Sequence, residues 1–366
     1  MHAALIIGTE AFDAERAWYD RTVSALMTTG IRITRVLPVD GRFDDRLALA
    51  PQVPYGGVCR WWALRPSQRW ATLCESFDGG ITPDLVHAIG QHAWRPALAL
   101  AESLERPLAI SVWDAKELPQ IARLARRDVV AGVLTATPPM AEALRHSIDA
   151  SLVRCVPLGV YAVERRAPAN EARGNAVACI VAGRGASLPA IKAFLTGCAE
   201  AIGDDPEFMI FADLDRMVED KAWRHAQSGG LEGRFSLIPP VGRDRLLPLE
   251  SDLIVVPEAT HRASTFVLEA MARRRPVVAA RDGVIPALDD ASITTLIESG
   301  ESAEWRDTIS AFRNSPASFR DLANRASDWV SDNHAMNSQT ELLADTYRWL
   351  AKGGAVPLEA SVRRSR

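Results

Sequence analysis

The sequence has no long apolar run, no paired cysteines and no excess of positive charge, and each absence excludes a class of protein. Its five cysteines are widely spaced and form no Cys-x-x-Cys pair. They therefore predict neither a zinc site nor a disulfide framework, and they fit a reducing compartment. The apolar run at residues 5–8 is too short for a signal peptide, and no run is long enough to span a bilayer. The net charge of −4 gives no reason to expect a nucleic-acid partner. We predict a cytoplasmic protein.

Length and hydrophobic periodicity predict two α/β domains. A chain of 366 residues exceeds what one hydrophobic core usually supports. In both halves short apolar runs alternate with amphipathic stretches of helical period, which favours parallel βαβ units. Residues 159–175 are polar and lack such a period, so we predict a linker there. The predicted domains are residues 1–160 and 174–332, and a final helix lies within residues 333–352.

The predicted strands are residues 5–8, 31–39, 85–90, 108–113, 129–135, 154–158, 176–182, 207–212, 252–257, 276–280 and 294–297. The predicted helices are residues 12–29, 93–105, 116–126, 138–147, 187–202, 215–227, 264–274, 301–314, 316–332 and 338–350.

The segment from 257 to 280 has the most informative pattern. A buried strand ends at Pro257, a polar loop follows, and Ser264 is suited to cap the N-terminus of a helix. The first turn of that helix offers backbone N–H groups and the positive end of the helix dipole to a phosphate. Glu269 shares a helix face with Thr265, and a carboxylate there can accept hydrogen bonds from both hydroxyls of a ribose.

This segment resembles the donor-binding signature of the family-four retaining glycosyltransferases. The family pattern has two glutamates separated by seven residues, the second within Leu-Glu-Ala-Met-Ala, followed by a short turn and Pro-Val-Val-Ala. Residues 268–279 match it closely, and residues 283–286 are similar to the glycine loop that follows it in the family. The resemblance implies the GT-B fold, in which two Rossmann-like, doubly wound domains face a central cleft. It implies that the chain moves a sugar from a nucleotide-sugar to a hydroxyl acceptor with retention of configuration, and that Glu269 binds the ribose.

The sequence departs from the signature at its first glutamate, which is His261 here. The flanking glycines of the family are Arg262 and Ser264, and Glu258 lies three residues before His261. Either His261 and Arg262 contact the sugar or the diphosphate, or the donor chemistry is altered or lost. His261 as an ordinary loop residue stays an open alternative.

Other segments resemble the same family more loosely. Gly183-Arg184 resembles the end of the first donor-domain strand, whose arginine binds the diphosphate through charge-assisted hydrogen bonds. The family's lysine five residues later is Pro189 in this sequence. Asp114 follows a strand that ends in a histidine in the family, and Tyr347 resembles the tyrosine of a C-terminal helix that packs back on the first domain. The resemblance thus gives Glu258, His261 and Asp114 as catalytic candidates, and Glu269, Arg184, Gly183, Arg262, Ser264 and Thr265 as donor-binding candidates.

We expect no metal or organic cofactor, because cations of the protein and a helix dipole can stabilise a leaving diphosphate. One alternative is a non-catalytic relative that binds a nucleotide or a glycan as a scaffold or regulator. Another is a Rossmann oxidoreductase, but Gly183-Arg184-Gly185 lacks the third glycine of a dinucleotide fingerprint. A third is a metal site at Asp213 and Asp215, whose Asp-x-Asp spacing is common by chance.

Residues 60–70 hold three tryptophans and three arginines. A basic-aromatic surface of this kind suits an acceptor or anionic lipid, and it predicts peripheral contact with the inner face of the membrane. Packing of the tryptophans in the core, with the arginines solvated, stays open as well.

Overall fold

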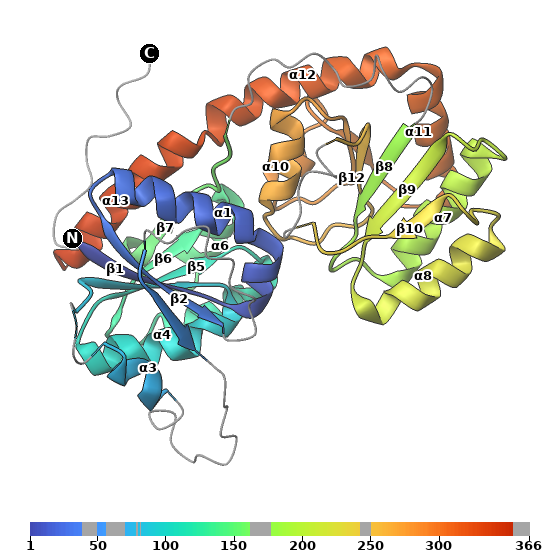
Figure 1. Ribbon diagram of the computed structural model, residues 1–366. Helices are drawn as coiled ribbons and strands as arrows, with labels where there is room; N and C mark the ends of the chain where they lie inside the picture. The colour runs from blue at the N-terminus through green and yellow to red at the C-terminus, as the bar shows by residue number, and fades with distance from the viewer. Residues whose placement is uncertain are drawn as a thin grey trace. The chain divides into compact units, whose positions relative to one another are not determined.

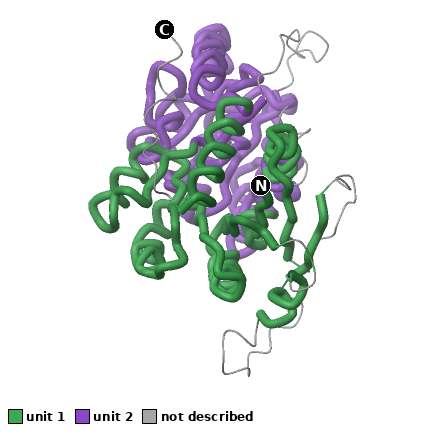
Figure 2. Tube along the Cα trace, turned by 90° about the vertical axis from the view of Figure 1, so that its left-hand side faces the viewer, with its two compact units in different colours: residues 1–12, 19–156, 337–366 green, residues 13–18, 157–336 purple. Residues whose placement is uncertain are grey.

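A computed structural model describes residues 1–38, 50–55, 70–77, 80, 82–161, 177–241 and 250–353. The chain divides into two compact units (Figure 2), each described here by itself. Unit 1 comprises residues 1–12, 19–156 and 337–366, and unit 2 comprises residues 13–18 and 157–336. The predicted basic-aromatic surface, except Trp70, and most of the predicted linker lie outside the described residues.

The described residues of unit 1 form a parallel sheet in the order β3-β2-β1-β4-β5-β6-β7. Its central strands β1, β4, β5 and β6 are mostly apolar and buried, as expected where both faces of a parallel sheet are covered. Helices α1 and α13 lie on one face and α3 and α4 on the other (Figure 1). The strands are β1 (His2–Ile7), β2 (Arg32–Pro38), β3 (Gln52–Tyr55), β4 (Leu85–Ile89), β5 (Leu108–Val112), β6 (Val130–Thr135) and β7 (Val153–Cys155), and the helices are α1 (Thr9–Thr28), α3 (Ala71–Glu75), α4 (Gln91–Leu104), α5 (Leu118–Leu124), α6 (Pro138–Arg145) and α13 (Met336–Ala351).

Unit 2 has a second parallel sheet, in the order β10-β9-β8-β11-β12-β13. Helices α7 and α8 cover one face and α10 lies on the other (Figure 1). The core on the α7 side includes a close approach to α11, where a Cβ on Gly197 would meet the backbone oxygen of Ser302 at 2.5 Å. The strands are β8 (Val177–Ala182), β9 (Phe208–Asp213), β10 (Phe235–Leu237), β11 (Leu253–Val256), β12 (Val277–Ala280) and β13 (Thr295–Ile297), and the helices are α7 (Leu188–Ile202), α8 (Arg216–Ser228), α10 (Thr265–Ala272), α11 (Ser302–Asn314) and α12 (Pro316–Asn333).

The strand order of unit 2 is that of a doubly wound Rossmann sheet. It runs outward in opposite directions from β8 and β11, which are neighbours in the sheet but separated in the chain. In open parallel sheets a ligand binds outside the carboxyl ends of the strands at this reversal. The topology therefore directs attention to the loops after Ala182 and Val256.

A fully buried polar cluster joins α13 to the sheet of unit 1. His87 contacts the hydroxyl of Tyr347 through Nδ1 at 2.5 Å and that of Ser111 through Nε2 at 2.8 Å. Burial lowers the pKa of His87 to about 3, so its ring is neutral at pH 7. Both ring nitrogens have partners, and burying the neutral ring is therefore tolerable. Through this contact α13 packs on the sheet of unit 1.

Replacing Tyr347 with Phe should destabilise the fold by about 1–3 kcal/mol, because Nδ1 of His87 loses its partner while it stays buried. Urea unfolding measures this loss. Tyr161→Phe is the matched control, since the Tyr161 side chain is 46% exposed. Equal stabilities of the two variants would show that the cluster contributes nothing to attaching α13.

Candidate functional site

The loop after β8 begins with Gly183, which packs closely against two neighbouring side chains. A Cβ on Gly183 would lie 2.5 Å from Cδ2 of Leu214 and 3.0 Å from Cδ1 of Ile191. The backbone N–H of Gly183 donates to the carbonyl oxygen of Asp213 at 3.0 Å, which holds the turn against the end of β9. This close packing fixes where Arg184 leaves the sheet.

Arg184 is held by two aspartates at the same edge. Its Nε donates to Oδ1 of Asp213 at 2.7 Å, and its NH1 lies 3.9 Å from Oδ1 of Asp215. The carboxylate of Asp213 is buried and also accepts from the backbone N–H of Val241 at 3.0 Å. Burial raises the pKa of Asp213, and the hydrogen bond from Val241 and the charge of Arg184 oppose that rise. The ion pair aligns a guanidinium that is still 37% exposed, so it remains able to contact an anion.

Glu258, in the loop after β11, reaches the N-terminus of α7. Its carboxylate accepts from the backbone N–H and from the hydroxyl of Ser187, the latter at 3.2 Å. Ser187 itself caps α7, and Pro189 stands at the start of that helix. Glu258 thus lies at the carboxyl ends of the strands, where a ligand is expected. Its carboxylate is bound to the N-terminus of α7, where it complements the helix dipole.

The helix that follows this loop starts as the sequence predicts. Ser264 caps α10, and its hydroxyl accepts from the N–H of Phe266 at 3.2 Å. Glu269 lies one turn after Thr265 on the same helix face and is buried.

The N-terminus of α10 already has a carboxylate. This carboxylate is that of Glu15, whose side chain is buried. Glu15 lies in the segment 13–18, which belongs to unit 2. It accepts from the backbone N–H of Thr265 and from the hydroxyl of Ser264, both at 3.0 Å, and from the hydroxyl of Thr265. The backbone of α1 departs from helical angles at this residue, with φ −131° and ψ 26°. Glu15 therefore takes the position in which the first turn of α10 would receive another anion.

His261 is fixed by a buried aspartate. Its backbone has a φ of +56°, in the left-handed region that a non-glycine residue adopts only when its surroundings hold it there. Its N–H donates to Oδ2 of Asp282 at 2.9 Å, and its Nδ1 lies 3.3 Å from Oδ1 of the same carboxylate. The N–H groups of Val284 and Ile285 also donate to Asp282. The imidazole is 41% exposed and the carboxylate is not exposed at all.

The remaining predicted residues are distributed over both units. Arg262 is half-buried in the same loop as His261. Asp114 belongs to unit 1, where its carboxylate accepts from the N–H of Lys116 at 2.8 Å and caps a short turn. Asp215 accepts from the N–H of Gly185 at 2.8 Å. Across the described residues no group of three or more His, Cys, Asp or Glu side chains is placed to hold a metal ion.

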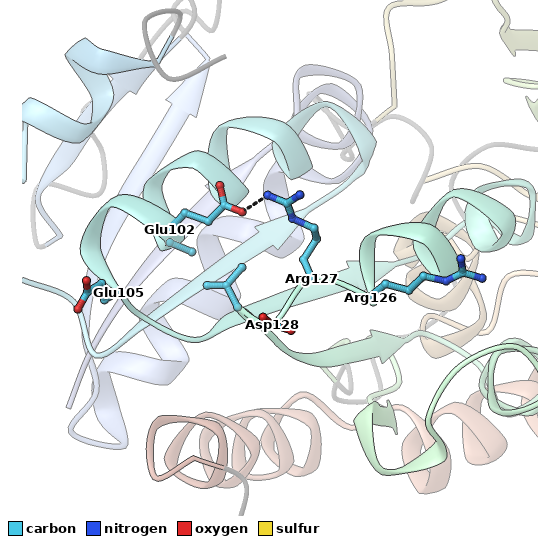
Figure 3. A pocket seen from close by; sticks show the side chains of 7 residues that line it. Glu102, Glu105, Arg126, Arg127 and Asp128 are labelled. Atoms are coloured by element: carbon cyan, nitrogen blue, oxygen red, sulfur yellow. Dashed lines mark hydrogen bonds and ion pairs between the residues drawn. The ribbon is translucent and has the colours of Figure 1, made fainter. Parts of the chain in front are cut away.

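A pocket of unit 1 lies elsewhere. It has a volume of about 450 Å³ between the C-terminal end of α4 and the loop before β6 (Figure 3). Arg127 crosses it to Glu102 at 2.5 Å, and Glu105 and Asp128 add further acidic groups. Because it opens near the amino ends of the strands, it is not at the edge where parallel sheets bind ligands.

Comparison with known proteins identifies the architecture. No protein-family model matches the sequence. The HepE protein of Anabaena, solved with UDP-glucose, superimposes with a TM-score of 0.76 at 16% identity over 94% of this chain and 99% of that one. Sucrose-phosphate synthase of Thermosynechococcus elongatus superimposes with a TM-score of 0.75 at 14% identity over 96% and 100% of the two chains. The chain has the GT-B fold. The predicted fold class is thereby confirmed.

The sequence relationship points the same way. The D-inositol 3-phosphate glycosyltransferase of Mycolicibacterium smegmatis is 30% identical over 128 residues, which are 34% of this chain and 27% of that protein. The match thus spans about a quarter of the curated relative. It confirms the resemblance to family-four glycosyltransferases. In the described part of the chain no helix is both long and apolar enough to cross a membrane.

Two residues of the candidate site, Asp282 and Glu15, were not predicted from the sequence. Asp282 had a signal, because it follows the end of β12 by two residues and stands in an Asp-Gly pair. Glu15 had none, because the residue lies 249 positions before Ser264. An isolated glutamate in an amphipathic helix gives no indication of such a contact.

Proposed function

We propose that this GT-B protein is a glycosyltransferase that moves a sugar from a nucleotide-sugar to a hydroxyl acceptor, with retention of configuration, in the cytoplasm. The observation that carries the proposal is the position of Arg184, which leaves the sheet directly after β8, at the strand reversal of unit 2. A guanidinium there can bind two phosphate oxygens and stabilise the negative charge that develops on the leaving diphosphate.

The loop and helix after β11 supply the other half of the donor site. The first turn of α10 offers backbone and hydroxyl donors to a phosphate, and Glu269 lies one turn later, where it can accept from a ribose. Glu15 now occupies that first turn. Donor binding at α10 consequently requires the Glu15 carboxylate to leave, and a diphosphate with its larger charge is suited to replace it.

A non-catalytic nucleotide-binding or glycan-binding protein is the second candidate. Three observations favour it: His261 replaces a glutamate of the family signature, Pro189 replaces a lysine, and Glu258 is engaged with Ser187. Such a protein would bind the nucleotide-sugar without transferring the sugar.

A thermal-shift screen against nucleotide-sugars and their nucleoside diphosphates tests the proposed function. We expect at least one nucleoside series to raise the melting temperature, since a ligand that binds only the folded state stabilises it. A turnover assay with the ligand found, over a panel of hydroxyl acceptors, then separates the two candidates. Acceptor-dependent release of nucleoside diphosphate supports the enzyme, and stabilisation without turnover supports the binding protein. No stabilisation by any of these nucleotides overturns both the enzyme and the nucleotide-binding protein.

Transfer should be insensitive to metal chelation. Arg184 and the helix dipole of α10 are proposed to stabilise the leaving group, so no divalent ion has to do so. The turnover rate is therefore expected to stay the same in excess EDTA. A rate that falls in EDTA and returns with manganese would instead move the leaving-group role to a metal at Asp213 and Asp215.

A further inference from the structure

The His261–Asp282 pair is held by more hydrogen bonds than an ordinary loop position requires. Four contacts converge on the buried carboxylate of Asp282: three backbone N–H groups and Nδ1 of His261. A buried carboxylate is costly unless such donors satisfy it. The left-handed backbone of His261 adds a further cost, which surroundings of this kind must offset. The result is an imidazole with one edge fixed against Asp282 and its ring 41% exposed.

The pair also lies next to the proposed phosphate contacts. Strands β11 and β12 are adjacent and parallel, with Val256 opposite Ala279, so the loops that follow them emerge side by side. Thr260 approaches the loop of Arg184, because a Cβ on Gly185 would lie 3.6 Å from Cγ2 of Thr260. Three residues after His261 comes Ser264, the cap of α10. His261 thus belongs to the loop that approaches Gly185 through Thr260 and leads into the first turn of α10.

Hydrogen-bond chemistry fixes which way the ring can act. A carboxylate only accepts, so Nδ1 must be the donor toward Asp282. Nε2 is then the nitrogen left for a ligand, and in the protonated ring it is a second donor that carries positive charge. The guanidinium of Arg184 already shares its charge with Asp213 and Asp215. A further hydrogen-bond donor at this edge would suit a diphosphate, which presents more phosphate oxygens than a monophosphate.

We propose that His261 binds the terminal phosphate of the donor's nucleoside diphosphate through Nε2, and that Asp282 is the positioning residue that holds its ring. The inference rests on the proposed function, because it names a contact of the same donor site. It assigns His261 to the leaving group and not to the transferred sugar.

Calorimetric titration with UDP and UMP, or with GDP and GMP if the guanosine series binds, tests the assignment. His261→Ala should weaken UDP binding about tenfold, the size expected for one charge-assisted hydrogen bond, and leave UMP binding within about twofold. The matched control is His146→Ala, because the side chain of His146 is 73% exposed in unit 1.

A double-mutant cycle tests the positioning role of Asp282. Asp282→Asn should weaken UDP binding in the parent protein and have no further effect in the His261→Ala background, since its role is exerted through that ring. A purely structural role would give the same loss in both backgrounds and overturn the role of Asp282. Equal losses for UDP and UMP in His261→Ala, or no loss, would overturn the phosphate contact. If the parent binds neither UDP nor GDP, the proposed function fails first and the inference fails with it.

Discussion

Arg184→Ala is expected to lower the rate of sugar transfer by about 10²–10³-fold, the usual cost of removing one fixed group that stabilises charge in a transition state. The loss should fall mainly on kcat, because charge on the leaving diphosphate increases as the glycosidic bond breaks. Arg184→Lys should recover only part of the rate, since an ammonium cannot bind two phosphate oxygens at once. Arg224→Ala, on an exposed position of α8, serves as the matched control and should leave the rate unchanged.

The same variant should also lose stability, because Asp213 stays buried without its ion-pair partner. We expect about 1–3 kcal/mol at neutral pH. The pKa of Asp213 is raised in the folded protein, so protonation favours folding, and this contribution is lost as the pH rises through the raised pKa. Removing Arg184 should raise that pKa further, so the stability deficit should shrink as the pH is lowered through it.

A double variant separates the two effects of Arg184. Arg184→Ala with Asp213→Asn removes the buried charge, so unfolding measurements should show stability restored while transfer stays slow. If transfer recovers together with stability, Arg184 acts only through the fold, and its role at the diphosphate is wrong.

Glu269→Gln should weaken binding of the nucleoside diphosphate about 10–150-fold, which corresponds to about 1.5–3 kcal/mol for a charged acceptor of ribose hydroxyls. The substitution keeps the volume of this buried side chain, so the melting temperature should change little. Titration with a ribose and a 2′,3′-dideoxyribose nucleotide measures the effect. The variant should reduce the preference for the ribose form.

Glu232→Gln is the control for this experiment, because Glu232 is exposed. Unchanged discrimination between the two nucleotides in Glu269→Gln would remove Glu269 from the donor site, even if overall affinity fell.

The sequence predicts the long elements of the fold well, because their periodicity is local. Strands β4, β5 and β8 begin or end within a residue of the predicted positions, and α7 and α11 do so as well. The short elements β3, β10 and α3 were missed, although β7 and β13 are equally short and were predicted. The assignment of residues 13–18 to unit 2 could not be predicted either, because it depends on contacts far apart in the chain.

The candidate site shows the same division. Arg184, Glu258, His261, Ser264, Thr265 and Glu269 were placed correctly after strands or on α10 because motif and secondary structure coincide there. Their roles stay predictions. The contacts that set the electrostatics of these residues join distant positions. Arg184 and Asp213 are 29 positions apart, and His261 and Asp282 are 21 positions apart. Only the sheet register brings such pairs together.

The central claim is that a nucleotide-sugar binds unit 2 at the carboxyl ends of β8 and β11. A crystal structure of the protein with its preferred nucleoside diphosphate tests this most directly. We predict the ribose on Glu269, the phosphates between Arg184 and the first turn of α10, and the Glu15 carboxylate displaced from Thr265. A nucleotide bound elsewhere, with Glu15 still on Thr265 and Arg184 contacting only its aspartates, would contradict the account.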